Sequence, residues 1–159
     1  MINLFEFFFV LLIAWLTVTT LLARKRRLDI LSGFNATEVV VGPTQSAMAI
    51  NIQTQKIMLV NINIYLESTN GNIISSLKTW VSFSVENVEA IDVLAFTNVN
   101  ASVHFKFYEP IGSWNHDRSL TYYGSPNVRP FLKKYFPNTP ITWQYKTKDE
   151  KILPWTDSL

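Results

Sequence analysis

The feature that most constrains this chain is an apolar N-terminal run that ends in a block of basic residues. Residues 4–23 contain a single charged side chain, Glu6, and the sequence Arg-Lys-Arg-Arg follows directly at residues 24–27. Twenty helical residues at about 1.5 Å each span roughly 30 Å, the thickness of the hydrocarbon core of a bilayer. The sequence therefore predicts one transmembrane helix with a basic stop, and an anchor region at residues 1–33.

A cleaved signal peptide is the first alternative for this run. Such a peptide carries positive charge before its apolar stretch and small residues after it, and here the order is reversed. We therefore expect the helix to be retained as an anchor. The residues assigned to the anchor and its ends are Glu6, Trp15, Arg24, Lys25, Arg26 and Arg27.

The basic block also predicts which way the chain is oriented. Lys and Arg remain preferentially on the cytoplasmic side of a membrane, so we expect the domain from Phe34 onward to face the cytoplasm. An opposing signal is its content of Asn, Ser and Thr, which is typical of exported β proteins. Asn35-Ala-Thr and Asn100-Ala-Ser also match the N-glycosylation pattern. The cytoplasmic side is favoured, and export stays open.

Glu6 has two interpretations. A carboxylate near the end of a span either reaches the headgroup region or forms a salt bridge with the N-terminal amine of a neighbouring chain. In the second case the segment resembles the N-terminal helix of type IV pilins, which is apolar with a glutamate near its start. The resemblance covers Met1 to about Leu22, and a basic block replaces the long amphipathic continuation of a pilin helix. It implies a component of a surface filament.

The domain that follows is neutral and free of cysteine. When the basic block and the two acidic residues of the anchor region are set aside, ten basic and ten acidic residues remain. A nucleic-acid binder carries its positive charge on the folded part, so we expect no nucleic-acid partner and assign the basic block to anionic lipid headgroups. Without cysteine, disulfides, thiolate metal sites and cysteine nucleophiles are excluded.

Alternation of apolar and polar residues is the main signal after residue 33. The expected strands are residues 60–66, 81–85 and 103–107, with shorter ones at 38–41, 47–53, 91–98 and 141–147, and turns at 69–72 and 98–100. This pattern predicts a mainly β domain at residues 34–147, an antiparallel sandwich or jelly roll. One short helix is expected at 128–136, and the rest of 110–140 is expected to be loop.

Residues that carry chemistry are sparse. His104 and His116 are the only histidines, and their spacing matches no compact zinc motif. The chain contains neither a Gly-x-Ser-x-Gly nucleophile elbow nor a cluster of glycines that would hold a phosphate. We therefore expect no enzyme activity, no cofactor and no metal.

Aromatic side chains concentrate near the C-terminus, with basic residues between them. Trp and Tyr are favoured at the centres of protein interfaces and near lipid headgroups. The segment 152–155 is apolar and follows a polar run, so the tail 148–159 is expected to dock on a neighbouring chain rather than join the fold. The candidates for partner binding are Trp114, Tyr122, Tyr123, Arg129, Lys133, Lys134 and Trp155.

These observations favour a structural or adaptor protein that links a bilayer to a larger protein assembly. A minor membrane protein of a lipid-containing virus particle fits this description, as does a subunit of a cell-envelope or organellar membrane complex. The expected partners are the lipid bilayer and other protein subunits. An exported filament or filament-base component is the alternative, and a membrane-tethered enzyme or small-ligand binder is the third.

Overall fold

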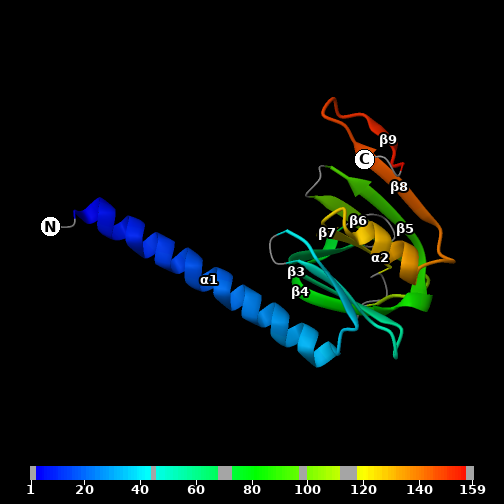
Figure 1. Ribbon diagram of the computed structural model, residues 1–159, viewed down its shortest axis with the longest axis horizontal. Helices are drawn as coiled ribbons and strands as arrows, with labels where there is room; N and C mark the ends of the chain where they lie inside the picture. Colours follow the sequence, from blue (N-terminus) through cyan, green and yellow to red (C-terminus); the bar gives the residue numbers. More distant parts are fainter. Residues whose placement is uncertain (1–2, 44–45, 68–72, 97–99, 112–117, 157–159) are drawn as a thin grey trace.

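The computed structural model describes residues 3–43, 46–67, 73–96, 100–111 and 118–156, with the backbone alone described for Ala23, Arg26 and residues 61–67 and 73–79. A long helix projects from a β-rich domain (Figure 1). In chain order the elements are α1 (Leu4–Phe34), β1 (Glu38–Val41), β2 (Ala47–Asn51), β3 (Lys56–Glu67), β4 (Ile73–Ser84), the short 3-10 helix η1 (Val85–Asn87), β5 (Val88–Ala95), β6 (Ala101–Phe107), β7 (Ser119–Gly124), α2 (Val128–Tyr135), β8 (Ile141–Lys146) and β9 (Ile152–Pro154).

Helix α1 is a single unbroken helix of 31 residues. At about 1.5 Å per residue it is roughly 46 Å long, longer than the hydrocarbon core of a bilayer. Asn35 ends it in the left-handed conformation, with φ of 56°, and its backbone N–H donates to the Ser32 carbonyl. The expected anchor region and the observed helix therefore agree to within a few residues.

Strand β3 joins two arms of the sheet, one formed by β1, β2 and β4 and the other by β7, β6, β5, β8 and β9. Its first half, at residues 56–60, pairs with β2 on one edge and β4 on the other, and Tyr65–Glu67 pairs with β7. The strand order is β1-β2-β3-β7-β6-β5-β8-β9, with β4 paired to β3. Neighbouring strands are antiparallel except β5 and β8, which are parallel. The mainly β architecture is confirmed, whereas an antiparallel sandwich or jelly roll is not.

The main core lies between the two arms and under α2. Phe83 of β4 packs against Phe105 and Phe107 of β6, with ring centroids 5.1 and 4.8 Å apart. Phe131 and Phe136, in α2 and just after it, are buried in the same cluster. On β6 the apolar residues face this core while His104 and Lys106 face outward, so the alternation read from the sequence gave the correct register.

Strands β2 and β3 are buried on both faces where they pair. Met48, Ile57 and Leu59 face the main core, whereas Met58 and Val60 face the other way and are also buried. This outer face is covered by the last turns of α1, which is why the burial does not alternate.

Two expectations are corrected by the backbone pairing. β7 forms at Ser119–Gly124 inside a region expected to be loop, because it fills the place between β6 and the end of β3. β9 at Ile152–Pro154 pairs with β8, so the tail joins the sheet instead of standing apart from it. The expected turns at 69–72 and 98–100 fall between strands that pair antiparallel, β3 with β4 and β5 with β6, but residues 69–72 and 98–99 themselves lie outside the described residues.

Candidate membrane-anchoring site

The part of α1 that stands clear of the domain is apolar around its whole circumference. Fourteen large apolar side chains between Leu4 and Leu22 are 48–79% exposed. The core helix of a soluble protein buries one face, and here none of the most apolar window is buried. Within the described residues α1 is the one helix long and apolar enough to cross a membrane.

Hydrocarbon is the solvent that this surface suits. Thirteen of the fourteen residues are Leu, Ile, Phe or Val, and each contributes about −0.3 to −0.6 kcal/mol when inserted near the centre of a bilayer. Their sum is roughly 4–8 kcal/mol in favour of insertion. Trp15 lies nine residues, or about 14 Å, before Arg24, which places it in the middle of the apolar segment.

The three threonines in this segment hide their polar groups within the helix. The Thr17 hydroxyl donates to the Ile13 carbonyl at 2.9 Å. The hydroxyls of Thr19 and Thr20 both donate to the Leu16 carbonyl, at 2.9 and 2.8 Å. An unpaired hydroxyl is costly in lipid, so these bonds make the segment compatible with a hydrocarbon environment despite its polar residues.

Glu6 takes part in the start of its own helix. Its backbone N–H donates to Asn3 Oδ1 at 2.8 Å, and its carboxylate accepts from the Asn3 backbone N–H at 3.3 Å. This reciprocal capping box satisfies two N–H groups at the helix end. The Asn-x-x-Glu spacing is visible in the sequence but was not used in its interpretation. A bond from Glu6 to a neighbouring chain stays a prediction.

The basic block separates the exposed apolar segment from the part of α1 that contacts the domain. Arg24 and Lys25 are exposed and Arg27 is half-buried, while the Arg26 side chain is not among those described. Lys and Arg at the end of a span place their charges among lipid headgroups. The structure therefore puts three described cations at the position where a bilayer surface would lie.

Beyond the basic block α1 packs directly onto the sheet. Ile30, Leu31 and Phe34 contact the buried cluster of Ala47, Met58 and Val60 on the outer face of β2 and β3. The Asn51 side-chain amide also donates to the Phe34 carbonyl at 3.1 Å, which satisfies a backbone acceptor at the helix end. The helix thus enters the domain without a linker. Sequence reasoning missed this contact because it joins residues far apart in the chain.

The predicted partner-binding residues of the C-terminal region form a cluster within the chain. The Arg129 guanidinium lies 4.6 Å from the ring centroid of Trp155 and 5.3 Å from that of Trp143. The two indoles meet edge to face at 5.7 Å, and Lys133 lies 5.9 Å from Trp143. Arg129 also donates to the Thr156 carbonyl at 3.1 Å. These contacts hold the tail against α2 and β8.

The remaining candidates are placed differently from one another. Tyr122 is 1% exposed and belongs to the core, where a partner does not reach it, whereas its neighbour Tyr123 is 47% exposed. Burial raises the pKa of the Tyr122 hydroxyl to about 12. Lys134 forms an ion pair with Glu38 at 3.3 Å. Trp114 lies outside the described residues.

Lys134 and Glu38 belong to a small clamp between α2 and β1. The Tyr135 hydroxyl also donates to the Glu38 carboxylate. The hydrogen bond from Tyr135, and then the bond and charge of Lys134, lower the pKa of Glu38. The clamp holds the first strand to the second helix.

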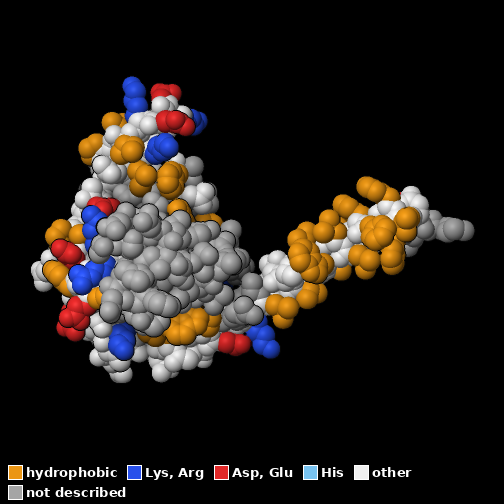
Figure 2. Space-filling view, turned by 180° about the vertical axis from the view of Figure 1, so that it is seen from behind, with side chains coloured by type: hydrophobic (Ala, Val, Ile, Leu, Met, Phe, Trp, Pro, Cys, Tyr) orange, Lys and Arg blue, Asp and Glu red, His pale blue; other side chains and the backbone are white. Residues whose placement is uncertain are grey.

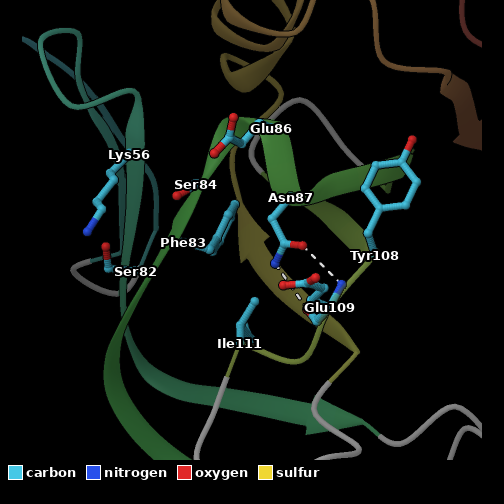
Figure 3. Close-up of a pocket in the computed structure, with 9 residues that line it drawn as sticks. All are labelled: Lys56, Ser82, Phe83, Ser84, Glu86, Asn87, Tyr108, Glu109 and Ile111. Carbon is cyan, nitrogen blue, oxygen red and sulfur yellow. Dashed lines mark hydrogen bonds between the residues drawn. The ribbon is translucent and has the colours of Figure 1, made fainter.

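An open pocket of about 510 Å³ lies where β3 begins and β4 ends (Figure 3). Glu86, Tyr108 and Glu109 line it, with Lys56 on the facing wall. The Asn87 side chain exchanges two hydrogen bonds of 3.0 Å with the backbone of Glu109, which fixes the end of β6. The pocket is polar, and its lining does not include His104.

Metal-ligating groups do not gather in the described part of the chain, where no three His, Cys, Asp or Glu side chains converge. His104 Nδ1 instead lies 3.0 Å from the Thr121 hydroxyl on the outer face of β6 and β7. His116 lies outside the described residues.

Comparison of the chain with known protein families, with curated proteins and with solved structures finds no match.

Proposed function

We propose that this protein is a single-pass membrane adaptor, in which α1 crosses a bilayer and the β domain binds other subunits of a protein assembly. The observation that carries the proposal is the exposed apolar segment of α1, with its threonine hydroxyls bonded inside the helix. Such a surface is unfavourable in water and favourable in lipid.

The adaptor role rests on the shape of the chain and on the chemistry of its domain. A helix that passes into a folded domain without a linker holds that domain close to the membrane. The domain also carries an open polar pocket. This arrangement fits a minor membrane protein of a virus particle and also a subunit of an envelope or organellar membrane complex. The basic block supports a cytoplasmic position for the domain.

An exported filament component is the second candidate, and it depends on Glu6 reaching a neighbouring chain. The capping box gives the Glu6 carboxylate a local partner, which weakens this candidate. A membrane-tethered ligand binder is the third, and the pocket of Figure 3 is the place where it would bind.

Replacing Leu12 by Asp tests the anchor. A charge at the centre of a span costs about 3 kcal/mol, which offsets a large part of the roughly 4–8 kcal/mol that favours insertion. A larger share of the variant than of the wild type should therefore move from the membrane pellet to the carbonate-soluble fraction. Ile152→Asp is the matched control, because Ile152 is 54% exposed, close to the 50% of Leu12, but lies in β9 of the domain. If both variants stay in the pellet, α1 is not what holds the protein to membranes.

The adaptor role and the topology need separate measurements. Protease protection of the domain in intact cells supports the cytoplasmic side, and digestion supports export. Purification in mild detergent followed by mass spectrometry should recover a stable set of companion proteins. Recovery of the chain alone from its native source, at every detergent strength, would argue against the adaptor role.

A further inference from the structure

The sheet face that receives α1 is wider than the helix that covers it. Backbone pairing sets Val41 opposite Ala47, Ala47 opposite Val60, and Val60 opposite Trp80. Residues directly opposite in antiparallel strands project from the same face, so these four form one row across β1, β2, β3 and β4. All four side chains are apolar.

The middle of this row is covered and its two ends are not. Ala47 and Val60 lie under Ile30, Leu31 and Phe34 of α1 and are 0 and 5% exposed. Val41 at one end is 53% exposed and Trp80 at the other is 49% exposed. An apolar surface therefore continues on both sides of the helix, at the place where the helix joins the domain.

Two further apolar side chains extend this surface beside the helix. Val39, two residues along β1 from Val41, projects from the same face and is 38% exposed, and Leu28 of α1 is 52% exposed. We name Leu28, Val39, Val41 and Trp80 the collar. Leu28 follows the basic block directly in the chain, and Val39, Val41 and Trp80 lie on the sheet face that the last turns of α1 contact. Figure 1 shows α1 projecting from the domain.

We propose that the collar lies in the headgroup region of the bilayer that α1 crosses, as a second contact between the domain and the membrane. This proposal rests on the proposed function of α1. The occupant is an anionic lipid surface, because the exposed cations Arg24 and Lys25 lie on α1 between the apolar segment and the collar residue Leu28.

The dimensions agree with this placement. Ile30 lies six residues, or about 9 Å along the helix, beyond Arg24. The headgroup region adds roughly 5–8 Å to each side of the hydrocarbon core. The sheet face that Ile30 contacts therefore lies at the outer edge of the headgroup region, and a Trp side chain that projects from this face reaches into that region. Trp is favoured at this depth because its ring is apolar and its N–H is polar. In Figure 2 hydrophobic side chains cover most of the projecting helix, and charged side chains are visible where the helix meets the domain.

Site-directed spin labelling tests the collar directly, since the chain contains no cysteine that would compete for the label. The full chain is reconstituted in nanodiscs containing phosphatidylserine, with a nitroxide at Trp80→Cys or at Val41→Cys. Tyr108→Cys is the matched aqueous control, because Tyr108 is 58% exposed and lines the pocket. Leu12→Cys reports the depth of the span.

The ratio of oxygen accessibility to nickel-chelate accessibility measures the depth of each label. We expect labels at Trp80 and Val41 to give ratios between those of Leu12 and Tyr108. Replacing phosphatidylserine by phosphatidylcholine should shift both toward the value of Tyr108. Two collar positions on different strands keep the test valid if one variant misfolds.

Three outcomes separate the explanations. Collar labels that match Tyr108, while the Leu12 label is deep in lipid, overturn the collar and leave the anchor intact. A water-exposed Leu12 label overturns the anchor itself. Spin–spin broadening at Val41 or Trp80 in liposomes, absent in nanodiscs that hold one copy, assigns the collar to a second copy of the chain and also refutes the proposal.

Discussion

Replacing Trp155 by Ala should destabilise the folded domain, because its indole is part of the cluster that holds the tail. The lost contact with the Arg129 guanidinium is worth about 0.5–1 kcal/mol, and the lost edge-to-face contact with Trp143 about 0.5–1.5 kcal/mol. Exposure of half-buried apolar surface adds about 1 kcal/mol. The total is about 2–3.5 kcal/mol, which corresponds to a fall in melting temperature of roughly 10 °C for a domain of this size.

Near-ultraviolet circular dichroism of the full chain in detergent is a suitable assay, because it follows the aromatic packing of the domain rather than the helicity of α1. Ile152→Ser is the matched control, since Ile152 lies in the same strand but is 54% exposed, and it should change stability by less than about 0.5 kcal/mol. A double-mutant cycle between Arg129→Ala and Trp155→Ala should give a coupling energy of about 0.5–1 kcal/mol.

One result would refute this reasoning. If Trp155→Ala melts like the wild type and also loses the companion proteins that co-purify with it, the tail is a docking element, as the sequence suggested. Strict additivity of the Arg129 and Trp155 substitutions would likewise show that their contact contributes nothing.

Three further predictions concern the core and its charged surroundings. Phe105→Ala should cost about 3–5 kcal/mol, whereas His104→Ala should cost about 1 kcal/mol or less, and equal losses in urea unfolding would contradict the register of β6. Tyr122→Phe should be neutral or stabilising at pH 7, because the Tyr122 hydroxyl is buried without a hydrogen-bond partner among the described residues. Since its folded pKa of about 12 exceeds the unfolded value of about 10, the wild type should also lose stability as the pH rises from 10 to 12, and Tyr122→Phe should lose less. The pKa of Glu38 is lowered in the fold, so the stability that its bonds contribute is present above the unfolded pKa of about 4.3 and is lost as the pH falls below it. The melting temperature of Glu38→Gln should therefore fall less steeply than that of the wild type over this acid range. Parallel curves would argue against the clamp.

The sequence predicts an element well where one physical signal dominates. Helix α1 was predicted because a predominantly apolar run of twenty residues is typical of a transmembrane helix. The register of β6 was found because one face is buried and the other is wet, which gives Phe105 and His104 opposite environments. The start of β1 at Glu38 was also predicted correctly, since a β-branched run follows a turn.

Elements that depend on distant partners were missed. β7 has alternating burial at Leu120, Tyr122 and Gly124, but the prolines and glycines around it favour a loop. β9 contains Pro154, which is tolerated because β9 lies at the edge of the sheet. The contacts of Arg129 with the two indoles could not be derived from the sequence, because they need α2, β8 and the tail to meet in space.

The parallel pairing of β5 with β8 sets an order of events in biosynthesis. Forty-five residues separate Ala95 from Ile141, so β5 emerges from the ribosome long before the strand that completes it. Long-range pairing of this kind is slow. Until it is complete, the unpaired edge of β5 is exposed and can pair with other chains, which promotes aggregation. Because α1 precedes the whole sheet in the chain, the membrane insertion proposed above would precede closure of the sheet. The nascent domain would then be held at a membrane surface during that interval, separated from chains in bulk solution.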